Sequence, residues 1–457
     1  MAKKFLILLT ITVLIFGLAG CRTRGGGGSA SKRVELTYYK LFDAEDTIKP
    51  IIQAYEKAHP NVKIKYKKFT EVEEYEELLI NELAEGEGPD IFEVQNTWVP
   101  RHMKKITPLA SETFTPQIFE ETFVTVAAKD FLQVDPKDGV VKVYALPLSV
   151  DTLALYYNKA HFDRYVTETG KPALSWDGIK ESVFQLRDDE GGALVRSGIA
   201  MGRSDNIALA EDILYALFLQ YGVNFYDSTY KNVRFATGEG QDALKLFTSF
   251  ADPKQKHYSW NSSLVNEDSM LKEVEAFLTG KTSMIIGYAS LYEDFEVMSK
   301  NVKSAGQDVI SLADIEVAPL PQKAEAEEQF KTYASYFGQT VSRTSKNPSQ
   351  AWDFIQFLTT KEQAQKYLDA AKRPTARRDL IEGQKRDPVL GVFVQQLGYA
   401  ESIPVYHDRK FKDFFVDAIT AVVDDDMTPS EALSEAQQLI NAILPEGGIY
   451  PPPPGIK

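Results

Sequence analysis

The chain has 457 residues, of which 51 are Lys or Arg and 65 are Asp or Glu, so its formal net charge is −14. A hydrophobic fraction of 44% with 25% charged residues is ordinary for globular proteins. This composition excludes a chain that is disordered, collagenous or coiled coil over its whole length. The acidic balance also argues against a nucleic-acid-binding protein, which carries a basic stripe. At roughly 150 residues per domain, the length predicts two or three domains.

The N-terminus has the pattern of a lipoprotein signal peptide. Lys3 and Lys4 precede the apolar run FLILLTITVLIFGLAG, which is shorter than the roughly 20 residues that cross a bilayer. An uncleaved short anchor is the alternative to a signal peptide over residues 1–20. The segment LAGC ending at Cys21 resembles the bacterial lipobox, which implies that Cys21 carries an acyl chain such as palmitate. Cys21 is the only cysteine in the chain, so it has no internal disulfide partner.

Flexible segments flank the predicted globular body. Residues 21–33 contain the run GGGGS and predict a tether whose 12 residues after Cys21 span about 20 Å. Residues 447–457 include Pro451 to Pro454 and predict a proline-rich tail in the polyproline II conformation. Together with the lipobox, the tether predicts a body held at the extracytoplasmic face of the cell membrane, either on the cell surface or in a periplasm.

The body begins with alternating strands and helices. Apolar residues alternate with polar ones at 34–38 and 62–66, and the segment DIFEV at 90–94 reads as a third strand. Apolar residues at helical spacing occupy 48–55 and 75–83 between these strands. This alternation predicts an α/β fold with a parallel, doubly wound sheet, whose ligands bind beyond the carboxyl ends of the strands.

Strands and helices are also predicted farther along the chain. Extended segments are expected at 141–148 and 153–157, with a buried strand at 283–288. Helices are expected at 176–186, capped by Ser175, at 207–221 and at 240–250. Three capping patterns predict further helix starts, at Asn347, Thr360 and Thr428.

The sequence carries no recognisable catalytic or metal-binding motif. It lacks a phosphate-binding P-loop, a zinc-protease HExxH and a GxSxG elbow. Its five histidines have no ligand spacing, and the acidic run Asp424 to Asp426 lacks the glycine of a calcium loop. We therefore expect no catalytic residue, no metal and no cofactor.

Several stretches occur in an order that resembles a known family. They are GPDIF at 88–92, YALPLSVDTLALYYNK at 144–159, WD at 176–177, FLTGKTSM at 277–284 and the paired-helix segment 345–368. Singly these are weak signals, but their order resembles the family 1 extracellular solute-binding proteins of ABC importers, which are similar to maltose-binding protein. The resemblance runs from about Val34 to Leu444.

The resemblance implies a two-lobed periplasmic-binding-protein fold with a ligand cleft between the lobes. Doubly wound sheets would be joined by three crossing segments, near 146–152, 287–291 and 337–342. Lobe one would then comprise residues 34–148 and 289–338. Lobe two would comprise residues 149–288 and 339–446.

The resemblance also implies a set of cleft residues. Trp and Tyr faces can stack on sugar rings, and Asp, Glu, Asn and Arg can hydrogen-bond to vicinal hydroxyls. Each also has a purely structural interpretation, such as helix capping for Asp43, core packing for Trp98 or a surface ion pair for Arg373. The expected ligand-binding residues are Phe42, Asp43, Glu93, Asn96, Trp98, Asp151, Asp205, Asn206, Tyr288, Tyr336 and Arg373.

These features predict a monomeric, lipid-anchored receptor that delivers a small polar solute to the permease subunits of an ABC importer. A sugar or an oligosaccharide is the expected solute. The same fold could instead carry a polyamine, a glycerophosphodiester or a peptide, and a cationic solute would require several carboxylates beside aromatic rings. A third interpretation is a lipoprotein enzyme acting on glycans, which would need two carboxyl groups roughly 5–10 Å apart.

Overall fold

The computed structural model describes residues 33–453 and 455, apart from residues 111, 113, 270 and 324. The predicted signal peptide, Cys21 and Pro454 therefore lie outside the described residues. Within the part of the chain that is described, no helix has both the length and the apolar character needed to span a bilayer.

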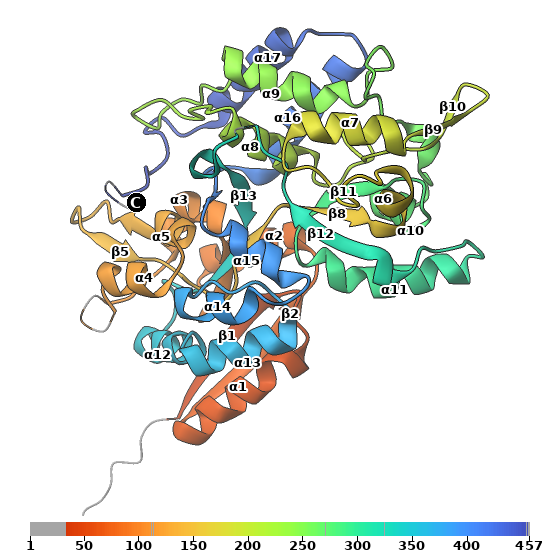
Figure 1. The fold of residues 1–457 in the computed structure, drawn as a ribbon. Helices are drawn as coiled ribbons and strands as arrows, with labels where there is room; N and C mark the ends of the chain where they lie inside the picture. Colours follow the sequence, from red (N-terminus) through yellow and green to blue (C-terminus); the bar gives the residue numbers. More distant parts are fainter. Residues whose placement is uncertain are drawn as a thin grey trace, which may run out of the picture.

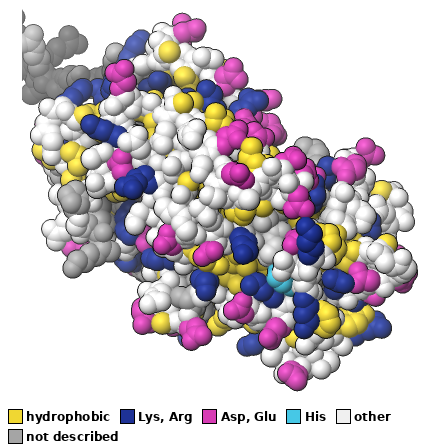
Figure 2. All heavy atoms as spheres, turned by 90° about the horizontal axis from the view of Figure 1, so that it is seen from above, with side chains coloured by type: hydrophobic (Ala, Val, Ile, Leu, Met, Phe, Trp, Pro, Cys, Tyr) yellow, Lys and Arg dark blue, Asp and Glu magenta, His cyan; other side chains and the backbone are white. Residues whose placement is uncertain are grey.

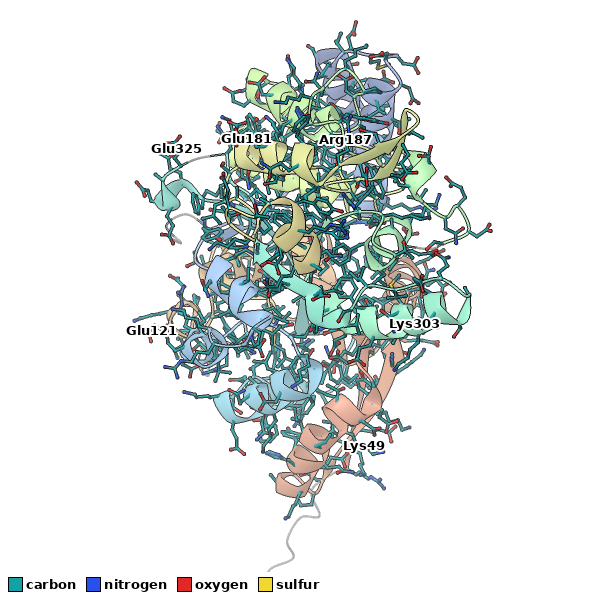
Figure 3. The ribbon with its side chains drawn as sticks, turned by 45° about the vertical axis from the view of Figure 1, so that its right-hand side comes forward. Lys49, Glu121, Glu181, Arg187, Lys303 and Glu325 are labelled. Atoms are coloured by element: carbon teal, nitrogen blue, oxygen red, sulfur yellow. The ribbon has the colours of Figure 1, made fainter. Side chains whose placement is uncertain are left out.

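Two separate hydrophobic cores divide the chain into two lobes. One core takes its residues from 34–150 and 334–400, and we call this part lobe one. The other takes its residues from 153–333 and 403–449, which we call lobe two, and it also includes Leu390 and Phe393 of helix α15 (Leu390–Gln396). In Figure 1 lobe one forms the lower body and lobe two the upper body, with α15 between them. Figure 3 shows Lys49 near the lower end of the molecule and Glu181 in its upper half.

Lobe one is built on a five-stranded sheet with the order β2-β1-β3-β14-β6. The strands are β1 (Val34–Leu41), β2 (Val62–Phe69), β3 (Ile91–Gln95), β14 (Phe337–Val341) and β6 (Leu146–Pro147). The first three run parallel, as the sequence predicts, whereas β14 is antiparallel to both of its neighbours, β3 and β6. The carboxyl ends of β1 and β3 therefore lie side by side at one edge of this sheet.

Helices cover this sheet because each carries one apolar face. In α1 (Glu45–Ala58) the buried residues Ile48, Ile51, Ile52 and Tyr55 follow the 3.6-residue period. The remaining lobe-one elements are α2 (Val72–Glu85), α3 (Val99–His102), α4 (Pro116–Thr122), α5 (Thr125–Phe131), β4 (Leu132–Val134), β5 (Val141–Val143), α12 (Pro348–Leu358), α13 (Lys361–Ala371) and α14 (Ile381–Gln384).

Lobe two surrounds a three-stranded antiparallel sheet with the order β11-β8-β12. These strands are β8 (Ala154–Asn158), β11 (Met284–Gly287) and β12 (Ile315–Pro319). The other elements of this lobe are α6 (Lys159–Tyr165), α7 (Trp176–Leu186), β9 (Asp188–Glu190), β10 (Ala193–Arg196), α8 (Ala210–Gln220), α9 (Gly238–Ser249), α10 (Lys272–Leu278), α11 (Leu291–Ser304), α16 (Asp408–Val423) and α17 (Pro429–Ile443).

Side-chain caps fix some of the predicted helix starts and not others. The Ser175 side chain accepts a hydrogen bond from the Gly178 amide at the start of α7, and Thr428 with Glu431 forms a capping box at the start of α17. Asn347 and Thr360 precede α12 and α13 without a capping side-chain hydrogen bond. For these two helices the position of the start was predicted correctly, but the cap was not.

The lobes are joined by a small hinge sheet made of three strands from distant parts of the chain. It has the order β15-β13-β7, with β7 (Asp151–Thr152), β13 (Thr332–Ser335) and β15 (Ala400–Glu401). Each strand lies where the chain passes from one core to the other. The three crossings therefore lie side by side in one sheet, with β13 paired to each of the other two strands. A change in the angle between the lobes must deform this short sheet.

The predicted lobe boundaries need correction in the middle of the chain. No crossing occurs near 287–291, because α11 packs back onto lobe two, where the Phe295 ring lies 5.3 Å from that of Tyr156. Strand β12 also pairs with β8 of lobe two. The chain returns to lobe one only at residues 333–334, and residues 341–380 contribute to the lobe-one core rather than to lobe two. The third crossing falls at 400–403.

Candidate ligand-binding site

A cavity of about 710 Å³ lies between the two cores and is lined by both lobes. Its lobe-one wall follows the carboxyl ends of β1 and β3 and includes Phe42, Glu93 and Trp98. Its lobe-two wall includes Glu211 and Asp212 at the start of α8 and Asp408 at the start of α16. Asp151 of the hinge sheet lies at the boundary between the walls. The cavity is large enough for a small ligand, whose usual pockets measure about 300–1,000 Å³.

Three aromatic rings form one side of this cavity. The rings of Phe42 and Trp98 each lie 6.1 Å from the ring of Phe337 in an edge-to-face arrangement. Phe42 follows β1 with a positive φ of 65°, an unfavourable conformation for a bulky residue, and its side chain is 43% exposed. This strained turn holds an exposed ring at the cavity, beside the buried Trp98.

A buried ion pair forms the floor of the lobe-one wall. The Lys40 ammonium contacts the Glu93 carboxylate and lies 3.0 Å from Asp43 Oδ2. Glu93 Oε2 also accepts a hydrogen bond of 2.8 Å from the Leu41 amide, and Glu93 Oε1 accepts one of 2.6 Å from Gln339. Burial alone would lower the pKa of Lys40, but Asp43 and Glu93 outweigh it and raise that pKa well above its usual range. Lys40 therefore stays charged.

Asp151 ties the hinge sheet to lobe two. Its carboxylate accepts hydrogen bonds from the amides of Ala289 and Ser290, at 2.9 and 3.2 Å, just before α11 begins. Burial raises the pKa of Asp151 to about 6, although these amides and Arg373 oppose the shift. Arg373 of lobe one also approaches lobe two, with its Nη2 atom 3.7 Å from Glu293 Oε2.

The lobe-two wall is dominated by carboxylates. Tyr288 donates a hydrogen bond of 2.6 Å to Asp212, while Lys412 Nζ lies 3.9 Å from Glu211 Oε2. Burial raises the pKa values of both Glu211 and Asp212, because few donors compensate the charged forms. Burial also raises the pKa of Asp408 to about 7, against the effect of a hydrogen bond from Trp98.

Contacts across the cavity hold the two walls together. The Trp98 indole donates its N–H to Asp408, and Arg409 Nη1 lies 3.8 Å from Glu73 Oε2. The Arg101 guanidinium lies 5.9 Å from the ring of Tyr406. Each pair joins lobe one to lobe two, so the structure shows the lobes in contact around the start of α16.

Most of the site residues expected from the sequence line this cavity. They are Phe42, Asp43, Glu93, Trp98, Asp151, Tyr288, Tyr336 and Arg373.

Three expected site residues lie elsewhere. Asn96 donates a hydrogen bond of 2.9 Å to the buried Asp130, and Asn206 accepts one of 2.7 Å from the Trp260 indole inside lobe two. Asp205 pairs at the surface with Arg203 at 2.8 Å. Their polar groups are engaged in local structure, so we remove them from the candidate site.

Sequence reasoning missed the acidic lobe-two wall and Gln339. Glu211 and Asp212 begin an apolar helix, where acidic residues are common because they complement the helix dipole. Asp408 lies almost 200 residues farther along the chain, and nothing local in its segment pointed to a site. Of these residues, only Gln339 could have been found from the sequence, because a polar residue in the middle of a buried strand such as β14 indicates a functional or structural role for its side chain.

A comparison with known families agrees with this geometry. The family described as bacterial extracellular solute-binding protein matches residues 43–365, more than half of the chain. The chain belongs to this family. The match confirms the resemblance seen in the sequence, and it identifies the protein as a solute-binding protein whose relatives act outside the cytoplasm.

Relatives of this solute-binding protein are similar in both sequence and structure. A galactooligosaccharide-binding protein of Bacillus subtilis is 27% identical over 161 residues, which cover 35% of this chain and 36% of that protein. The sugar-binding protein MalE of Xanthomonas citri has a TM-score of 0.72 at 15% identity, covering 90% of this chain and 97% of that chain. An ABC substrate-binding protein of Listeria monocytogenes in complex with cycloalternan has a TM-score of 0.69 at 18% identity, covering 90% and 99%. These structures confirm the two-lobed fold.

Proposed function

We propose that this protein is a receptor that binds a sugar or an oligosaccharide between its lobes and delivers it to an ABC importer. The observation that carries the proposal is the cavity of about 710 Å³, which both lobes line beside their hinge sheet. The aromatic rings of Phe42, Phe337 and Trp98 offer faces for the apolar side of a sugar ring. The similar proteins named for galactooligosaccharide, sugar and cycloalternan support this class of ligand.

The hinge makes the bound state recognisable to a transporter. A ligand that contacts both walls favours the arrangement in which Trp98 meets Asp408, because that arrangement satisfies contacts from both lobes at once. A permease that docks on the two lobe tips would then distinguish loaded from empty receptor by the angle between the lobes.

Membrane attachment through Cys21 completes the proposal. A lipidated Cys21 followed by a flexible tether would keep the receptor beside its permease at the extracytoplasmic face, as a monomer. The chain has 65 acidic residues against 51 basic ones. This negative net charge disfavours binding of the protein surface to anionic lipid headgroups. The anchor is therefore the lipid rather than a charged protein surface.

Calorimetric titration with a panel of mono-, di- and oligosaccharides tests the function. We expect one saccharide class to bind and to raise the melting temperature, since a ligand present at 100 times its Kd adds about 2.7 kcal/mol to the free energy of unfolding. If no saccharide binds at millimolar concentration, the proposal is wrong. We also expect each bound oligosaccharide to be recovered intact, and release of shorter sugars by the purified protein would favour an enzyme instead.

A further inference from the structure

The charge of the cavity is strongly unbalanced. Ten carboxylate side chains line it, against four cationic ones. All four cations already have acidic partners: Lys40 contacts Glu93 and Asp43, and Arg373, Arg409 and Lys412 lie 3.7–3.9 Å from Glu293, Glu73 and Glu211. A neutral ligand would add no positive charge to the cavity, so the desolvation cost of its surplus carboxylates would remain.

The excess of carboxylates over cations is concentrated on the lobe-two wall. Glu211, Asp212 and Asp408 lie at the starts of α8 and α16, two helices that pack against each other. Lys412 is the one cation within ion-pair distance of this trio among the described residues, and it lies 3.9 Å from Glu211 with a side chain that is 47% exposed. Such a loose, solvated partner compensates little of the negative charge of the trio.

Two oxygen atoms at the cavity also lack a hydrogen-bond donor. Gln339 is only 1% exposed, and its amide group donates to Glu93 while its Oε1 atom has no partner. Glu211 Oε2, on the other lobe, is buried without a hydrogen-bond partner. Gln339 and Glu211 come from opposite walls, so both walls require a donor that the described side chains do not supply.

We propose that the solute is a cationic saccharide, one that carries at least one protonated amino group facing the acidic wall of Glu211, Asp212 and Asp408. This inference rests on the proposed function and names its ligand class. An ammonium group supplies three donors and a positive charge, whereas a hydroxyl supplies a single donor and no charge. The aromatic side of the cavity then takes the sugar ring, and Gln339 Oε1 accepts from one of its hydroxyl or amino groups.

A metal ion is a poor alternative for the same wall. Among the residues that the structure describes, no three His, Cys, Asp or Glu side chains converge in a way that could hold one. Tyr215 and Tyr288 line the same cavity as the trio, and aromatic rings beside carboxylates suit an organic cation.

Matched pairs of sugars test the inference, because the two members of a pair differ only in having amino groups in place of hydroxyl groups, one in the first three pairs and three in the trimer pair. The pairs are glucosamine and glucose, galactosamine and galactose, trehalosamine and trehalose, and the β-1,4-linked glucosamine trimer and cellotriose. In calorimetric titrations at pH 7 we expect at least one amino sugar to bind tenfold or more tightly than its partner. The variant Glu211→Gln should remove most of that preference, whereas Asp417→Asn, an exposed acid on α16 outside the cavity, should leave it unchanged.

The outcomes separate the two claims. If a neutral sugar binds as tightly as its amino partner, or if Glu211→Gln leaves the preference intact, the inference is wrong and the proposed function stands. If spermidine and putrescine bind while no saccharide does, or if nothing in the panel binds, both claims are wrong. Melting curves show whether Glu211→Gln is folded, and Asp408→Asn provides a second removal of charge from the same trio.

Discussion

The indole nitrogen of Trp98 donates a hydrogen bond to the carboxylate of Asp408, and this bond links the two lobes across the cavity. Trp98 follows β3 in lobe one, whereas Asp408 begins α16 in lobe two. The two residues are 310 positions apart, so the contact exists only when the lobes are brought together. It therefore reports directly on the angle between the lobes.

Removing the donor should loosen the contact between the lobes. Trp98→Phe keeps an aromatic ring but leaves the Asp408 carboxylate without its N–H partner. We expect about ten- to hundredfold weaker ligand binding, since hydrogen bonds to charged groups contribute about 1.5–3 kcal/mol and each 1.4 kcal/mol is a factor of ten. Small-angle X-ray scattering should show a larger radius of gyration. Trp176→Phe is the matched control, because that indole donates to Gln220 within lobe two; equal effects of both variants would contradict the role of Trp98.

Asp151 should be important for stability as well as for the hinge. Asp151→Ala leaves the amides of Ala289 and Ser290 without their acceptor in a buried place. Each such buried amide costs about 1–3 kcal/mol, so for the two amides we expect urea denaturation to show a loss of about 2–6 kcal/mol. Asp205→Ala, at the surface, should change stability by less than about 0.5 kcal/mol and leave ligand affinity unchanged. A large loss of affinity in that control would return Asp205 to the site.

The raised pKa of Asp408 predicts a specific dependence of stability on pH. Burial raises this pKa to about 7 from an ordinary value of 3.8, so the folded state binds a proton that the unfolded state has released. The resulting stability is present below pH 4 and is lost as the pH rises to 7. Thermal melts should therefore show wild type losing stability relative to Asp408→Asn between pH 4.5 and 7.5. Parallel pH curves for the two proteins would contradict the shift.

Cys21→Ser should separate the protein from the membrane. Lipidation requires the thiol, and the only cysteine of the chain is Cys21. We expect cell fractionation to find the wild type with membranes and the variant in the soluble extracytoplasmic fraction. The folded body should be unaffected, so both proteins should give the same melting temperature. A variant that stays with the membrane would favour an uncleaved anchor.

Local patterns in the sequence were sufficient to predict much of lobe one. Strands β1 and β2 were predicted because apolar residues alternate there, β3 from the segment DIFEV after a helix break, and α1 because Ile48, Ile51 and Tyr55 recur at helical spacing. The crossing expected near residue 289 was wrong for a reason that periodicity cannot reveal. An amphipathic helix such as α11 shows that it packs on a core, but not on which of two cores it packs.

The candidate site was predictable only on the wall formed by strand ends. Glu93 and Trp98 follow from the rule that ligands bind beyond the carboxyl ends of parallel strands. Glu211 and Asp408 lie at helix starts in segments about 200 residues apart, and only the packing of α8 against α16 brings them together. Surface charge gives no further guide, because Figure 2 shows acidic and basic side chains interspersed over the face in view.

A crystal structure of the protein with its tightest-binding saccharide would show where the ligand lies. We predict electron density for the sugar in the cavity, in contact with Trp98 on lobe one and with the Glu211 side of lobe two. Density in another place, such as the shallow hollow lined by Lys180, Phe184 and Lys256, would contradict the account. An empty cavity in crystals that hold the sugar elsewhere would do the same.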